Sequence, residues 1–120
     1  MVIIESLKFE NVTLKFGGIT ALNEISFEVK PQKLYSIIGP NGAGKTSIFN
    51  CISGIYRPTT GTVKYGNNNI NELRPDEVAS LGIARTFQNI ELFENMTVLD
   101  NILIGCHRQL NYGPVSSLLF

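Results

Sequence analysis

A run of eight residues, Gly39-Pro40-Asn41-Gly42-Ala43-Gly44-Lys45-Thr46, carries the clearest chemistry in this 120-residue sequence. Glycine, four residues, glycine, lysine and a hydroxyl residue is the spacing of a phosphate-binding loop. Glycines leave room for backbone N–H groups to close around a phosphate, and a following helix adds N–H groups and the positive end of its dipole. The run therefore predicts that the chain binds a nucleotide through its phosphates.

Individual side chains of the run have expected roles. The Lys45 ammonium is expected to reach the β- and γ-phosphates, and the Thr46 hydroxyl is expected to hold Mg²⁺. The phosphates are expected to lie against residues 39–47, which include Ser47 after the loop. A glycine-rich turn with an incidental lysine is the alternative, but a chance match to this template is rare at average composition.

A strand and a helix must flank such a loop, and the neighbouring sequence predicts both. Leu34 to Ile38 is a short apolar run that predicts a buried strand before the loop. Ser47 to Ser53 predicts the helix after it, with Ile48, Phe49 and Ile52 on one apolar face. Strand, loop and helix together form the α/β unit that the motif requires.

The sequence before this unit predicts an antiparallel layer. Residues 2–30 alternate apolar and polar side chains, and the alternation changes phase around Glu10-Asn11, which predicts a bulge or kink. Gly17-Gly18 and Pro31-Gln32-Lys33 predict turns. Strands first and a helix later indicate an α/β fold with an N-terminal β layer.

Shorter elements are predicted further along the chain. Thr62 to Tyr65 and Ile83 to Phe87 predict strands, and Gly66 to Asn69 predicts a loop. A helix is predicted from Pro75, a favoured first helical residue, to Gly82. Thr97 to Asp100 resembles a capping box and predicts a helix through about His107.

Composition excludes several classes of protein. Ten basic and ten acidic residues give a net charge of zero, so nothing indicates a nucleic acid or an anionic membrane surface as partner. No apolar run is long enough for a transmembrane helix, and the first residues lack the pattern of a signal peptide. Cys51 and Cys106 form no metal or redox motif and indicate free thiols in a reducing cytoplasm.

Three segments of the sequence resemble the motifs of a known protein family. Phe16-Gly17-Gly18, the loop at 39–46 and Gln88 are similar, in this order, to the adenine-stacking loop, the Walker A motif and the Q-loop of ABC transporter ATP-binding subunits. Residues 82–89 and 96–101 resemble the subunits that drive import of branched-chain amino acids, whose close relatives serve urea or other small amides and acids. GTPases usually carry Asp-x-x-Gly after the loop, which this sequence lacks.

The resemblance implies a fold and a set of ligands. The fold is an α/β P-loop NTPase core, and the ligands are ATP and Mg²⁺. Phe16 would stack on adenine, although a core residue at a strand end is the alternative. Gln88 would contact the metal together with Thr46 and would act in catalysis with Lys45, although a solvated polar residue is the alternative.

The resemblance also implies partners and a location. The partners are transmembrane permease subunits and a second ATPase subunit, in a homodimer or a heterodimer, on the cytoplasmic face of the cell membrane. Residues 1–88 would form the β layer and the phosphate loop through the Q-loop, and residues 89–120 the start of a helical subdomain. Leu92 to Thr97 would lie near the groove that receives the coupling helix of the permease.

The ABC signature Leu-Ser-Gly-Gly-Gln and a Walker B strand do not occur in the 120 residues. Asp76-Glu77 follows no apolar strand and is better interpreted as the start of a helix, and His107 precedes the expected signature, so it is not the switch histidine. We therefore expect an incomplete, N-terminal nucleotide-binding domain that binds Mg-ATP weakly without turnover. The first hypothesis for function is the ATP-binding, energy-coupling ATPase subunit of an amino-acid importer, of which these residues are the N-terminal half. The alternatives are an inactive ATP-binding fragment of such a subunit and a small kinase.

Overall fold

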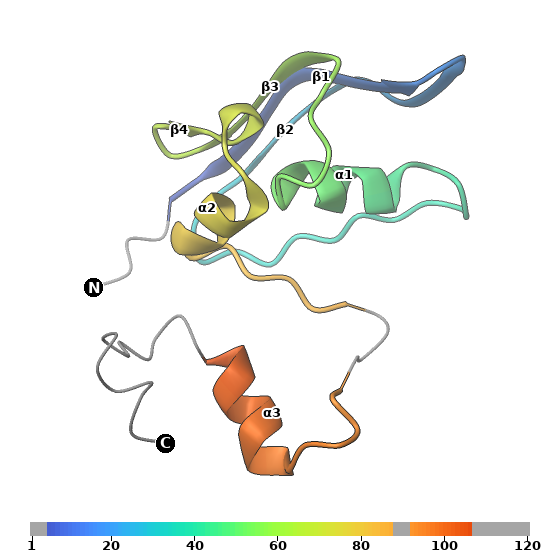
Figure 1. The fold of residues 1–120 in the computed structure, drawn as a ribbon. Coiled ribbons are helices and arrows are strands. Elements are labelled where there is room, and N and C mark those ends of the chain that lie inside the picture. Colours follow the sequence, from blue (N-terminus) through green and yellow to red (C-terminus); the bar gives the residue numbers. More distant parts are fainter. Residues whose placement is uncertain (1–4, 88–91, 107–120) are drawn as a thin grey trace. The chain divides into compact units, whose positions relative to one another are not determined.

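The computed structural model describes residues 5–87 and 92–106 (Figure 1). The chain divides into two compact units, Met1–Arg85 and Thr86–Phe120. The first unit contains β1 (Leu7–Phe16), β2 (Ile19–Val29), α1 (Lys45–Ile52), β3 (Thr60–Tyr65), β4 (Asn68–Asn69), the 3-10 helix η1 (Ile70–Glu72) and α2 (Pro75–Ser80). The second unit contains α3 (Val98–Gly105).

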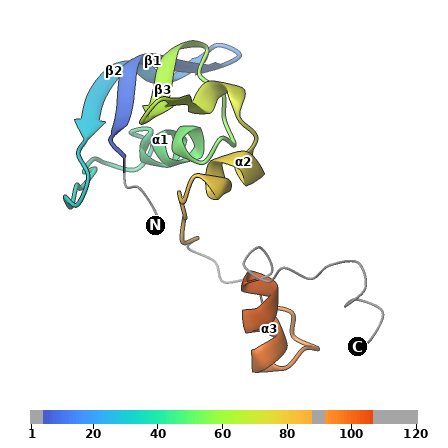
Figure 2. The ribbon, with the colours of Figure 1, turned by 90° about the vertical axis from the view of Figure 1, so that its left-hand side faces the viewer.

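The strands form one antiparallel sheet in the order β2-β1-β3-β4, as the colours in Figure 2 show for the first three. This sheet confirms the predicted N-terminal antiparallel layer. The turns at residues 17–18 and 31–32 are also confirmed. The predicted loop at residues 66–69 is partly wrong, because Asn68–Asn69 pairs with Lys64 and Tyr65 as a two-residue strand.

The predicted bulge near residues 10–11 is confirmed in β1. Phe9 pairs with Phe27 and Val12 with Ile25, so β1 has one more residue than β2 between these pairs. Asn11 takes a φ of 49°, and its N–H donates to the Ser26 hydroxyl at 2.8 Å. The extra residue returns the apolar side chains of both halves of β1 to the same, buried face.

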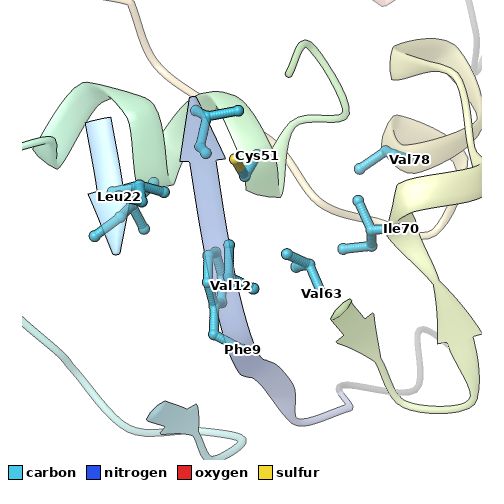
Figure 3. Packing of buried hydrophobic residues seen from close by; sticks show 9 residues of the cluster. Phe9, Val12, Leu22, Cys51, Val63, Ile70 and Val78 are labelled. Carbon is cyan, nitrogen blue, oxygen red and sulfur yellow. The ribbon is translucent and has the colours of Figure 1, made fainter. Parts of the chain in front are cut away.

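The core lies between the sheet and α1, which covers one of its faces (Figures 1 and 3). Its buried side chains are Phe9, Val12, Leu14, Leu22, Ile48, Cys51, Val63, Ile70 and Val78. The predicted inner face of α1 is wrong at one position, since Phe49 is 45% exposed and Cys51 is buried. The buried stripe follows Ile48, Cys51 and Ile52, which is the i, i+3, i+4 spacing of an amphipathic helix.

Two predicted strands are wrong. Leu34–Ile38, hereafter the apolar segment, forms no strand, and Leu34 and Ile38 are 97% and 93% exposed. Residues 83–87 form no strand either. A run that is apolar on both faces is typical of a central strand in a parallel sheet, which requires a strand on each side. In the parts of the chain that the structure describes, all strand pairs are antiparallel and none includes these residues.

The two predicted late helices are confirmed with shorter bounds. In α2, Pro75 is the first residue, and the Glu77 carboxylate accepts the Arg74 N–H at 2.7 Å. At the start of α3, the Thr97 hydroxyl accepts the Asp100 N–H at 3.2 Å, and the Asp100 carboxylate accepts the Thr97 N–H. His107, the predicted end of this helix, lies outside the described residues. Neither described unit contains a helix of the length and apolarity needed to span a bilayer.

Candidate nucleotide-binding site

The loop of residues 39–44 leads directly into α1, so its last glycine is the N-cap of that helix. The first hydrogen bond of the helix runs from the Ile48 N–H to the Gly44 carbonyl at 3.0 Å. Helix geometry therefore leaves the N–H groups of Lys45, Thr46 and Ser47 without an intrahelical acceptor. These groups and the positive end of the helix dipole form a site suited to an anion such as a phosphate.

The Lys45 side chain spans this loop. Its ammonium donates to the carbonyls of Gly39 and Pro40, at 2.7 Å each. The Ala43 N–H donates to the Pro40 carbonyl at 3.2 Å, so two kinds of contact close the same turn. An ammonium has three N–H donors, so a phosphate oxygen can be bound by the third while the loop contacts persist.

Gly44 determines how the loop packs on the sheet. Its φ is 84°, and a Cβ built there would lie 2.6 Å from the Ala21 carbonyl oxygen and 2.9 Å from Leu22 Cδ2. Both the left-handed backbone and the contact with β2 therefore exclude a side chain at this position. The phosphate loop is thus held directly against the β2 backbone.

Phe16 is the last residue of β1. It lies at the turn end of the β1–β2 hairpin, as do the β2 residues against which Gly44 packs. Phe16 pairs with Ile19 of β2. Ala21, the residue beside Gly44, is two residues after Ile19 and therefore about 7 Å further along the strand. The Phe16 ring is 45% exposed and meets the Tyr56 ring edge to face, with centroids 5.0 Å apart. The expected base-stacking residue is therefore partly exposed and has a defined aromatic neighbour.

The structure adds residues that the sequence analysis did not assign. The Arg85 guanidinium donates to the Asn50 side-chain oxygen at 2.6 Å and lies 5.9 Å from the centre of the Phe49 ring. The Asn50 carbonyl accepts the N–H groups of Ile55 and Tyr56 at 2.9 and 3.1 Å. The contacts of Arg85 join residues about 35 positions apart in the sequence, so no periodicity could have revealed them.

Comparisons with known proteins agree with this geometry. Residues 22–117 match the family model described as ABC transporter. The chain belongs to the ABC transporter family. The branched-chain amino-acid transport ATP-binding proteins LivG of Escherichia coli K12 and BraF of Pseudomonas aeruginosa are each 43% identical to it, over 113 and 112 residues. The matches cover 94% and 93% of this chain and 44% of each relative, so this ABC chain spans less than half their length.

Solved structures give the same result for the fold. A nucleotide-free ATP-binding cassette of an ABC transporter matches with a TM-score of 0.76 and 38% identity, over 96% of this chain and 45% of its own. A cassette in its ADP conformation matches with 0.77 and 38%, over 98% and 46%. The predicted fold class, an α/β ABC ATPase core with an N-terminal antiparallel layer, is confirmed.

Of the two residues expected to hold the metal in this ABC chain, Thr46 lies among the described residues. Among residues 5–87 and 92–106, no group of three or more His, Cys, Asp or Glu side chains could hold a metal ion. Thr46 still fits Mg²⁺, because this ion keeps several waters and binds mainly through substrate phosphates and one or two protein oxygens. Gln88 lies outside the described residues, so its contact with the metal stays a prediction.

Proposed function

We propose that this chain forms part of the ATP-binding, energy-coupling subunit of an ABC importer for branched-chain amino acids or related small solutes. The observation that carries the proposal is the Lys45 ammonium, held across residues 39–40 beside the N–H groups that begin α1. This arrangement provides fixed positive charge and directed donors at one point, as a triphosphate requires. The names of the 43%-identical relatives support the transported class.

The proposal assigns a task to each residue of the expected site. The N–H groups of Lys45, Thr46 and Ser47 bind phosphate oxygens, and the Lys45 ammonium binds the β- and γ-phosphates. The Thr46 hydroxyl is exposed and holds Mg²⁺, which neutralises charge on the phosphates when it is bound. Phe16 stacks on the adenine through its exposed face. Gln88, which lies outside the described residues, would contact the metal and the attacking water.

Binding and turnover are separate parts of the proposal. ABC ATPases complete the site with the signature run of a second subunit and with a Walker B aspartate and glutamate, and the 120 residues contain neither. We therefore infer that these residues by themselves bind Mg-ATP without hydrolysing it. Turnover would require those groups, since the metal otherwise lacks its aspartate and the water its base.

The proposed partners are permease subunits and a second ATPase subunit at the cytoplasmic face of the membrane. Within the second unit, an apolar pocket of about 470 Å³ is lined by Leu92, Phe93, Met96, Val98 and Ile102, among others. Its position in the sequence agrees with the predicted coupling-helix groove at residues 92–97. We assign residues from about 89 to the start of the helical subdomain, and residues 1–88 to the β layer and the phosphate loop through the Q-loop.

Titration calorimetry with Mg-ATP tests this function on the wild-type chain, Lys45→Ala and Lys30→Ala. Loss of the charge-assisted contact should weaken binding at least about tenfold in Lys45→Ala. Lys30 is an exposed lysine that directly follows β2, outside the phosphate loop, so its removal should leave affinity unchanged. A wild-type chain that binds no Mg-ATP would refute the proposal, and turnover that Lys45→Ala abolishes would contradict only the inference of inactivity.

A further inference from the structure

The loop between α1 and β3, residues 53–59, is attached at both ends to different parts of the site. At its start, the Asn50 carbonyl of α1 accepts two N–H groups of the loop. At its end, the Thr59 N–H donates to the Thr13 carbonyl at 2.8 Å, and the Thr59 hydroxyl accepts the Lys15 N–H at 3.0 Å. Because Lys15 directly precedes Phe16, the loop connects the phosphate-loop helix to the strand end that carries the expected base-stacking ring.

Tyr56 lies in this loop against Phe16. The rings are 5.0 Å apart and inclined by 71°, an edge-to-face arrangement that aromatic pairs favour. Tyr56 is partly buried, packs against the hydrophobic core, and its N–H is bound by Asn50. Phe16 is the more exposed of the two rings and stands at the end of its strand. Tyr56 is therefore the fixed member of the pair, and Phe16 is the member whose orientation it sets.

We propose that Tyr56 is a positioning residue for base recognition. It holds the Phe16 ring so that the exposed face is available to the adenine of a bound nucleotide. The proposal rests on the proposed function, since it requires that the loop binds ATP. It makes the Tyr56 side chain act on the base only, because its ring contacts Phe16, whereas the link to α1 runs through the Tyr56 backbone N–H, which a substitution leaves in place.

The competing explanation is that Tyr56 only fills the core. The two explanations differ in which ligand is affected. A core residue would alter every part of the site through loss of folding, whereas a residue that positions Phe16 would alter binding of the base and leave the triphosphate unaffected. Inorganic tripolyphosphate carries the phosphates of ATP without the base, so it separates the two explanations.

The experiment measures Kd for Mg-ATP and for Mg-tripolyphosphate with the full chain, Tyr56→Phe and Tyr56→Leu. Tyr56→Phe keeps the ring and should stay within about twofold of wild type for both ligands. Tyr56→Leu keeps apolar volume without the ring and should weaken Mg-ATP about three- to tenfold with tripolyphosphate unchanged. Equal weakening of both ligands, or unchanged Mg-ATP binding, would overturn the proposal.

A second comparison tests whether Tyr56 acts through Phe16. In a Phe16→Leu background, Tyr56→Leu should no longer change the ratio of the two affinities, since there is no ring left to position. A further loss in that background would overturn the proposal, and Tyr56→Met replaces Tyr56→Leu if the latter does not fold. A wild-type chain that binds neither ligand refutes the proposed function as well, whereas Lys45-dependent Mg-ATP binding with unaffected Tyr56 variants refutes this inference alone.

Discussion

The guanidinium of Arg85 donates a hydrogen bond of 2.6 Å to the side-chain oxygen of Asn50, a residue of helix α1. The same guanidinium lies over the Phe49 ring, 5.9 Å from its centre. Arg85 immediately precedes Thr86, the first residue of the second unit. The last residue of the first unit is therefore bound to the helix that follows the phosphate loop.

This contact predicts energetic coupling between Arg85 and Asn50. In a double-mutant cycle with Arg85→Ala and Asn50→Ala, urea unfolding should give a coupling free energy of about 1–2 kcal/mol, as expected for a hydrogen bond from a charged donor. Arg85→Lys keeps the charge but loses the planar donor group, so it should recover only part of this value. Additive effects of the two alanine substitutions would contradict the prediction.

One glycine of the β1–β2 turn and two of the phosphate loop predict a graded series of stabilities. Gly18→Ala should change the free energy of unfolding little, because no atom lies within 4 Å of the new Cβ and the backbone is not left-handed. Gly42→Ala adds only the strain of a φ of 85° and should cost about 1–2 kcal/mol. Gly44→Ala adds contact with Ala21 and should cost about 1–3 kcal/mol more. Denaturant unfolding of the three variants checks the order, and equal losses for Gly42→Ala and Gly44→Ala would refute the packing explanation.

Burial of Cys51 predicts an unreactive thiol. Desolvation raises its pKa from 9.0 to about 11, so at pH 8 it stays protonated, and only the thiolate is nucleophilic. Iodoacetamide followed by mass spectrometry should modify the partly exposed Cys106 first, and Cys51 only after unfolding in guanidinium. Rapid modification of Cys51 in the folded chain would show that the core opens readily.

The same shift predicts how stability depends on pH. The pKa of Cys51 is higher in the folded state than in the unfolded state. The stability that the buried thiol contributes is therefore fully present below pH 9.0 and is lost as the pH rises towards 11. The free energy of unfolding should therefore fall less steeply over this window in Cys51→Ala than in wild type. Identical slopes in the two proteins would contradict the pKa shift.

The apolar segment predicts self-association. It lines, with β2 and α1, an apolar cavity of about 670 Å³. A segment with apolar side chains and unpaired backbone N–H and C=O groups is a template for pairing with another chain. The mass measured by ultracentrifugation should therefore rise with concentration, and Leu34→Lys with Ile38→Lys should reduce the rise. Ile19→Lys, at an exposed site outside the segment, is the control. A strictly monomeric wild-type chain with a sharp unfolding transition would refute this prediction.

Local signals in the sequence predicted the features that depend on neighbouring residues. The bulge at Asn11, the cap at Thr97 and the loop before Lys45 each depend on a few adjacent residues, and the structure has the bulge, the cap and the loop geometry at these positions. The strands predicted at residues 34–38 and 83–87 were wrong, because a strand requires a neighbouring strand to pair with. The sequence of the segment itself does not specify that neighbour.

The site shows the same division. The sequence predicted the phosphate loop because its residues are consecutive. It could not predict that Tyr56 lies against Phe16, or that Arg85 binds Asn50 across 35 positions. Such pairs arise only when the sheet and α1 come together, and the spacing of the residues carries no signal of them.

The contact between Gly44 and Ala21 means that part of the nucleotide-binding motif is maintained by the fold itself. In a library of variants selected only for folding, without nucleotide, the exposed Thr46 would accept other residue types, and Lys45 would be constrained only by its contacts with the Gly39 and Pro40 carbonyls. Position 44 would remain glycine, because the β2 backbone excludes a side chain whether or not a phosphate is bound. Mutational tolerance across these adjacent positions would therefore separate the residues required for folding from those required for nucleotide binding.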